Sequence, residues 1–271
     1  MKVKLYISAD IEGVAGVVHS EHTTRDGREH DRARMLMTEE VNACIRGAIA
    51  AGASEIVVND SHGTMRNIIP ELLHTEASLI SGSPKKMAMV EGLDETFDAA
   101  VFIGYHTKKG DFGLLNHTFS GKVVRSIKVN GIEYGEFGLN ALVAGHFNVP
   151  VICVSGCDRL EKEVRELIPE VYFATVKQTI NQFTARSIHP KKAQELIERQ
   201  TKEGWMNRGN IPLFSIDGPV TVEMSFNTTG FAENAAILPI VDQIDPSTVT
   251  FNASNIIEGY RYIRSLIMIA N

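Results

Sequence analysis

Two carboxylates and two imidazoles follow short apolar segments of the sequence, where they could act together in one site. They are Asp10, Glu12, His62 and His106. Asp10 and Glu12 stand two residues apart, which points both carboxylates to the same side of an extended chain. Each residue alone is also consistent with a solvated turn or an ordinary loop histidine. Because all of them follow apolar segments, we favour a shared site over separate structural roles.

The combination of side chains indicates which metal ions such a site would bind. Mixed carboxylate and imidazole ligands suit zinc, manganese or iron better than calcium or magnesium. The sequence has three cysteines but no CxxC pair, which argues against a structural zinc site built from thiolates. The candidates are numerous enough for two metal ions with a carboxylate between them, and such pairs activate water. The residues therefore predict a hydrolytic metal centre.

Two further polar residues lie near these candidates. Asp60 could be a ligand, a turn residue, or the acceptor that orients His62. We favour the last role, because a metal-bound imidazole usually donates its other N–H group to an acceptor. His117 lies in a polar, glycine-containing loop after His106, where it could act as a general acid or base or simply be exposed.

The first part of the chain has the pattern of a parallel α/β sheet. Apolar strands are expected at 2–9, 54–59, 77–81, 99–105 and 150–155, with helices at 29–51 and 137–147. A hairpin is expected over 122–134 around Asn130-Gly131. Near-continuous apolar runs separated by helices predict a three-layer α/β/α fold with a mostly parallel sheet. Ligands of such sheets collect beyond the carboxyl ends of the strands, which is where the candidate residues fall.

The pattern changes after about residue 160, where a smaller α+β C-terminal region is expected. Helices are predicted at 159–168, 190–204 and 254–270, and strands at 171–176, 219–226 and 248–252. We divide the chain into a metal-binding α/β domain at 1–160 and the α+β region at 161–271. No clear linker marks this boundary, so a single domain is the alternative.

Composition excludes several classes of protein. The chain has 271 residues, of which 44% are hydrophobic and 22% charged, as in an ordinary globular protein. Its net charge of −6 gives no basic surface for a nucleic acid. No apolar run reaches the roughly 18 residues that a membrane span requires, and the N-terminal residues do not resemble a signal peptide. With an odd number of cysteines, we expect reduced thiols and a cytoplasmic location.

Several motifs carry a resemblance to a known family. They read SADIEGVAGV, VNDSHGTM, MVEGLD, FIGYH, LNHT and GEFGLNALVAGHFNVPV. In this order and spacing they resemble the zinc-dependent D-aminopeptidase family. The likeness extends over nearly the whole chain and is weakest after about residue 200.

The resemblance implies a specific site. Two zinc ions per subunit are implied, with Asp10 bridging them. The implied ligands of one ion are Asp10, Glu12 and His62, and those of the other are Asp10, His106 and Glu136. The family's catalytic histidine falls on His117. From the residues alone, Glu136 is an ordinary acidic residue in the first turn of a helix.

The resemblance also implies an activity and an assembly. The expected activity is hydrolysis of short peptides or amides with a free N-terminal amino acid of D configuration. The implied assembly is a homodecamer of two stacked pentamers that encloses the active sites. Three alternatives stay open at this point: an L-specific or other amidohydrolase on the same scaffold, a metal-dependent phosphoester hydrolase, and a non-catalytic peptide- or metal-binding protein.

Overall fold

A seven-stranded sheet, sheet A, forms the larger part of the computed structural model, which describes residues 3–271. Its strand order is β3-β2-β1-β4-β7-β8-β9. The strands are β1 (Lys4–Ala9), β2 (Glu55–Asp60), β3 (Ala77–Ile80), β4 (Ala99–Tyr105), β7 (Val151–Cys157), β8 (Tyr172–Asn181) and β9 (Thr184–Ser187). Every neighbouring pair is parallel except β8 and β9. The expected mostly parallel sheet is confirmed.

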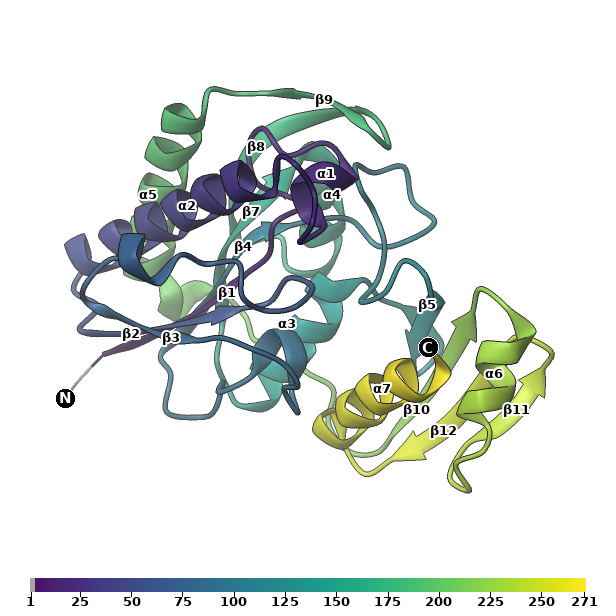
Figure 1. The fold of residues 1–271 in the computed structure, drawn as a ribbon. Coiled ribbons are helices and arrows are strands. Elements are labelled where there is room, and N and C mark those ends of the chain that lie inside the picture. The colour runs from purple at the N-terminus through teal and green to yellow at the C-terminus, as the bar shows by residue number, and fades with distance from the viewer. Residues whose placement is uncertain (1–2) are drawn as a thin grey trace.

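Helices cover both faces of sheet A, as the three-layer prediction requires. Its strand order runs from β1 towards β3 in one direction and from β4 towards β8 in the other. Crossovers between parallel strands are right-handed. Helices that connect strands in one direction along the sheet therefore lie on the opposite face from helices that connect strands in the other direction. α2 (His30–Ala50) joins β1 to β2, whereas α3 (Glu136–His146) and α4 (Asp158–Leu167) precede β7 and β8. α5 (Pro190–Met206) packs along α2 (Figure 1).

A smaller antiparallel sheet, sheet B, lies beside this body with two helices (Figure 1). Its strands are β5 (Val124–Val129), β6 (Ile132–Glu133), β10 (Val220–Phe226), β11 (Asp242–Asp245) and β12 (Thr248–Ala253), and its helices are α6 (Thr229–Ala235) and α7 (Ile256–Ala270). The expected hairpin at Asn130-Gly131 joins β5 to β6. Each sheet takes strands from both sides of residue 160, and the division at that position stays a prediction.

Short helices complete the chain. They are α1 (Ser20–Thr23) and the 3₁₀ turns at Pro70–Leu72, Ala88–Val90 and Arg208–Asn210. Within the described residues, no helix combines the length and the apolar character needed to cross a membrane.

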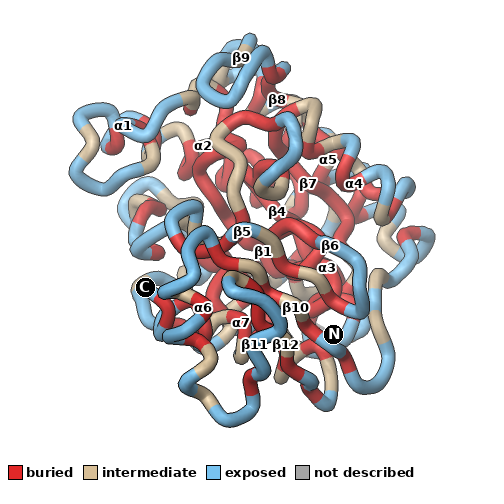
Figure 2. The backbone as a smooth tube through the Cα atoms, turned by 90° about the vertical axis from the view of Figure 1, so that its right-hand side faces the viewer, coloured by how far each residue is buried: buried red, intermediate tan, exposed pale blue. Residues whose placement is uncertain are grey.

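The core follows from the apolar character of the central strands. Every residue of β4 and β7 is buried, in agreement with their near-continuous apolar sequences. Figure 2 shows the buried backbone running through the strands of sheet A. α7 begins with a side-chain cap, in which Asn255 Oδ1 accepts a hydrogen bond from the N–H group of Glu258 at 3.0 Å. This cap fixes the start of a helix whose inner face packs on β10, β12 and α3.

The loop after β1 touches the last residues of β4, backbone to backbone, where the strand order reverses. The N–H group of Gly13 donates to the carbonyl oxygen of Gly104 at 2.7 Å. A Cβ atom on Gly104 would lie 2.1 Å from the carbonyl oxygen of Asp10, and the φ angle of Gly104 is +71°. Glycine is therefore required at residue 104, and the contact holds the ends of the two strands together.

Replacing Gly104 with alanine is expected to lower the free energy of unfolding by roughly 3 kcal/mol, because the methyl group would overlap the Asp10 carbonyl. Urea denaturation followed by circular dichroism measures this loss. Gly218→Ala is the matched control, because Gly218 also has a positive φ, +77°, but nothing within 4 Å of a new Cβ. A loss no larger than that of the control would contradict the close approach.

Candidate metal centre

Six of the seven side chains singled out in the sequence lie together at the carboxyl edge of sheet A. They are Asp10 and Glu12 after β1, His62 after β2, His106 after β4, His117 in the loop that follows, and Glu136 at the start of α3. We call these six residues the site cluster. It lies at the reversal of strand order between β1 and β4, where open α/β sheets bind their ligands.

Asp10 occupies the centre of the site cluster. Its Oδ1 atom is 3.2 Å from Nδ1 of His62, and its Oδ2 atom is 3.6 Å from Nε2 of His106. Glu12 Oε2 lies 3.0 Å from the same His62 nitrogen, and Glu136 Oε2 lies 3.3 Å from the same His106 nitrogen. The carboxylates thus form two groups, one around each imidazole, and Asp10 belongs to both.

Backbone carbonyl groups fix the orientation of both imidazoles. The Nε2 atom of His62 is 2.7 Å from the carbonyl oxygen of Thr23, and the Nδ1 atom of His106 is 2.9 Å from that of Thr107. In each ring, the N–H group that donates to the carbonyl leaves the other nitrogen facing the carboxylates. This is the arrangement of histidines that bind metals in proteins.

The expectation that Asp60 orients His62 is wrong. Its carboxylate instead accepts hydrogen bonds from the backbone N–H groups of Asn67 and Ile68 and from the Asn67 side-chain amide. Asp60 therefore shapes the loop after His62, and Thr23 supplies the acceptor for the imidazole. No sequence pattern indicates this partner, because Thr23 lies 39 positions from His62 and accepts the hydrogen bond through its backbone carbonyl.

His117 lies at the edge of the site cluster. Its ring stacks on that of His106, with centroids 4.3 Å apart, and its Nε2 atom is 3.7 Å from Glu136 Oε1. The N–H group at Nδ1 donates to the carbonyl oxygen of Leu115 at 3.0 Å. Its side chain is 24% exposed, whereas that of His106 is 1% exposed. His117 is thus the most accessible titratable group of the cluster.

Burial and mutual charge set the protonation of the metal-free cluster. Burial, together with the charge of Glu12, raises the pKa of Asp10 to about 7. Burial alone would lower the pKa of His62, but the charge of Glu12 raises it well above its usual value. Glu136 raises the pKa of His106 in the same way, against the effect of burial. Protonated imidazoles therefore compensate the buried carboxylates when no metal is bound.

The donor atoms fit a metal ion. The buried atoms Asp10 Oδ2, Glu12 Oε2 and His106 Nε2 make no hydrogen bond, although each lies within 3.6 Å of an oppositely charged group of the cluster. Buried polar atoms without a hydrogen bond are unfavourable unless a ligand satisfies them. Ligand atoms lie within 4.8 Å of one another in two sets, which are Asp10, Glu12 and His106, and His106, His117 and Glu136. Nitrogen and carboxylate oxygen donors of this kind suit zinc.

A buried lysine that the sequence did not single out supports the loop of Asp10 and Glu12. Lys177 Nζ, on β8, donates hydrogen bonds to the backbone carbonyl groups of Glu12, Val14 and Val17. Burial lowers the pKa of Lys177 to about 8. A lone lysine inside an apolar strand is the only sequence signal of this role, because the contact joins segments more than 150 residues apart.

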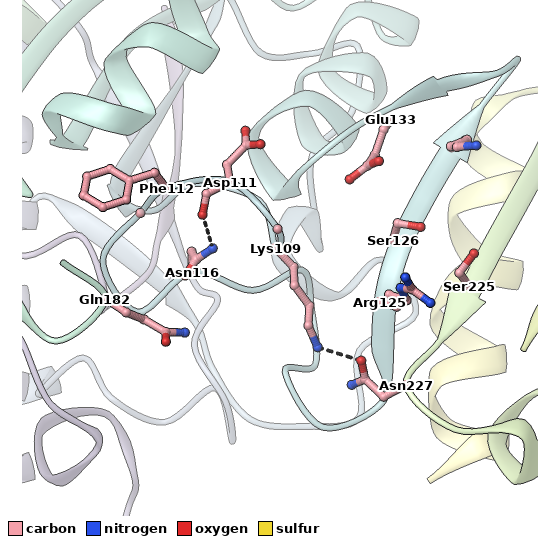
Figure 3. A pocket seen from close by; sticks show the side chains of 13 residues that line it. Lys109, Asp111, Phe112, Asn116, Arg125, Ser126, Glu133, Gln182, Ser225 and Asn227 are labelled. Carbon is pink, nitrogen blue, oxygen red and sulfur yellow. Dashed lines mark hydrogen bonds between the residues drawn. The ribbon is translucent and has the colours of Figure 1, made fainter.

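The site cluster borders a small cavity. Its volume is about 110 Å³, and its lining includes Asp10, His62, His117 and Glu136. A larger cavity of about 930 Å³ lies between the loop at 109–116 and sheet B (Figure 3). No residue of the site cluster lines the larger cavity, where Lys109 Nζ donates to Asn227 Oδ1. The chemistry therefore belongs to the smaller cavity and to a further cavity of about 360 Å³, whose lining includes Glu12 and His117.

Zinc binding is expected to release protons, because His62 and His106 have raised pKa values in the metal-free protein and must lose a proton to bind a metal. The apparent zinc affinity should accordingly rise between pH 6 and pH 8. Isothermal titration calorimetry in buffers of different ionisation enthalpy measures the release, expected at about one proton or more per zinc ion. Equal zinc affinity at pH 6 and pH 8 would contradict the protonation of His62 and His106 in the metal-free protein.

Comparisons with known proteins identify the family of this chain. The family model described as D-aminopeptidase matches residues 1–265. A D-aminopeptidase of Bacillus subtilis (strain 168) is 41% identical over 261 residues, which cover 96% of this chain and 94% of the relative. The solved structure of the Zn-dependent D-aminopeptidase DppA from Bacillus subtilis, a self-compartmentalizing protease, matches with a TM-score of 0.96 and 38% identity, covering 99% of this chain and 98% of the other. The expected family is confirmed: this chain belongs to the D-aminopeptidase family.

Proposed function

We propose that the site cluster is a dinuclear zinc centre in which Asp10 bridges the ions. The ligands are Asp10, Glu12 and His62 for one ion and Asp10, His106 and Glu136 for the other. The observation that best supports this assignment is the Asp10 carboxylate, whose two oxygens face different imidazoles at 3.2 and 3.6 Å. The zinc dependence of the structural relative agrees with it.

The chain is a zinc-dependent D-aminopeptidase, a metallo-exopeptidase. Zinc in such a centre polarises the substrate carbonyl group and lowers the pKa of a water molecule towards neutrality. His117 Nε2 faces Glu136 and the small cavity, so it can take a proton from water or donate one to the departing amine. The hydrogen bond from Nδ1 to Leu115 keeps Nε2 free for this proton transfer.

The proposed substrate is a short peptide or amide with a free N-terminal D-amino acid, in agreement with the descriptions of the family and of both relatives. The cavities that the site cluster borders, of about 110 and 360 Å³, admit small residues and exclude a folded chain. Met65, Met89 and Phe119 add apolar walls beside the site cluster. A metal-dependent phosphoester hydrolase is not favoured, because the family and both relatives are aminopeptidases.

The proposed assembly is a homodecamer of two stacked pentamers with the active sites inside. The relative that forms a self-compartmentalizing protease supports it. Three exposed apolar side chains also support this assembly, because apolar groups exposed together often mark a protein–protein interface. They lie on the β8–β9 hairpin and the loop beside it and are each more than half exposed: Phe112, Ile180 and Phe183. A cytoplasmic location belongs to the same proposal and is supported by the three buried, free cysteines.

The experiment that tests the activity compares three substrates with the zinc-loaded protein: D-alaninamide, L-alaninamide and p-nitrophenyl phosphate. D-alaninamide is expected to react at least roughly tenfold faster than its L enantiomer, with activity lost to a chelator and restored by zinc. Preference for the L enantiomer would favour the alternative amidohydrolase. Release of phosphate without amide hydrolysis would favour the phosphoester hydrolase.

A pair of variants separates metal binding from proton transfer. Asp10→Ala is expected to lose both zinc ions, because Asp10 belongs to both ligand groups. His117→Ala is expected to keep both ions and lose about 10²- to 10⁴-fold in kcat, the usual contribution of a general acid or base. Elemental analysis of zinc and steady-state kinetics on D-alaninamide measure the two effects. Full turnover in His117→Ala, or one zinc ion retained in Asp10→Ala, would refute the respective assignment.

A further inference from the structure

An arginine from the C-terminal helix lines the cavity of the metal centre. Arg264, on α7, shares the cavity of about 110 Å³ with Asp10, His62 and Glu136. Its Nε atom is buried and has no hydrogen-bond partner. Among residues 3–271, no carboxylate forms an ion pair with Arg264. A guanidinium group that is partly buried and unpaired is unfavourable unless a ligand satisfies it.

The surroundings of Arg264 are cationic. A second cavity of about 350 Å³ adjoins it, and its lining includes Lys85, Lys86 and Arg261 together with Arg264. Arg264 is the only arginine or lysine in the lining of the cavity of the metal centre. The same lining includes the carboxylates of Asp10 and Glu136 and apolar side chains such as Met89 and Phe119.

A short peptide with a free carboxyl group matches this arrangement of charge. The amino end and the reacting carbonyl group must lie at the site cluster for an aminopeptidase to cleave the first bond. The other end of a dipeptide is a carboxylate, which needs a cationic partner of its own at a distance from the reacting carbonyl group. Guanidinium groups bind carboxylates through paired, charge-assisted hydrogen bonds, so Arg264 is the group that this end of the substrate requires.

We propose that Arg264 binds the C-terminal carboxylate of a dipeptide substrate and thereby makes the enzyme prefer dipeptides over amides. This role deepens the proposed function and rests on it. Arg264 would act on specificity, since it touches the departing residue of the substrate and not the bond that breaks. In a longer peptide the carboxylate would pass beyond Arg264, so the advantage belongs to the shortest substrates.

The test compares D-alanyl-D-alanine with D-alanyl-D-alaninamide, which differ only in the terminal charge. In the unmodified enzyme, kcat/KM is expected to favour the free acid. Arg264→Gln is expected to reduce this preference about 10- to 100-fold, with most of the change in KM for the free acid. Arg264→Lys should restore part of the preference, because it restores the charge without the paired geometry.

Arg261→Gln is the matched control. Arg261 lies one turn earlier on α7 and lines only the second cavity, so its loss is expected to leave the preference for the free acid in place. The zinc content of each variant, from elemental analysis, shows that the metal centre is intact. An equal loss of preference in Arg261→Gln and Arg264→Gln would overturn the assignment, because it would indicate a general effect of positive charge.

Three further outcomes also decide the question. Equal KM values for the free acid and the amide in the unmodified enzyme would overturn the role of Arg264 without any variant, so misfolding of Arg264→Gln leaves the test intact. Hydrolysis of both substrates with an unchanged ratio in Arg264→Gln would refute only the role of Arg264. Failure of the unmodified enzyme to hydrolyse either substrate would refute the proposed function and this assignment together.

Discussion

The structure depends on placing three buried carboxylates around two imidazoles. Asp10, Glu12 and Glu136 are each at most 4% exposed. Carboxylates buried this closely repel one another and lose their hydration, so they need compensating positive charge. Protons on the imidazoles provide it in the metal-free protein, and cations provide it in a metalloenzyme. A cluster that needs this compensation contributes little to folding stability by itself, but it is well suited to bind metal ions.

The fold places these charges through backbone contacts rather than through side-chain pairing. The strand order reverses between β1 and β4, which brings the loops after both strands to one point. Gly13 and Gly104 allow the loop after β1 to touch the end of β4, and Lys177 holds the carbonyl groups of the loop that carries Glu12. α3 then begins at Glu136, so that its first side chain reaches His106. Rigid backbone of this kind keeps ligand atoms in place before any metal binds.

Much of this arrangement could be predicted from the sequence, because it depends on local pattern. Buried strands are near-continuous apolar runs, and the polar residues that follow them meet at one edge, which is how Asp10, His62 and His106 were found. Only the family resemblance predicts Glu136 as a metal ligand, because the helix dipole already explains an acidic residue in the first turn of a helix. Contacts between distant segments had no local signal. The sequence therefore does not indicate the contacts of Lys177 or the place of Arg264 in the cavity lining, and it predicts for Asp60 the role that the Thr23 carbonyl performs.

Anomalous diffraction at the zinc edge, from crystals of the zinc-loaded protein, is the decisive test of the proposal that Asp10 lies between two zinc ions. Two anomalous peaks about 3.5–4 Å apart are expected, one on each side of the Asp10 carboxylate. One peak would belong with Glu12 and His62 and the other with His106 and Glu136. A single peak, or peaks remote from Asp10, would contradict the bridging role of Asp10.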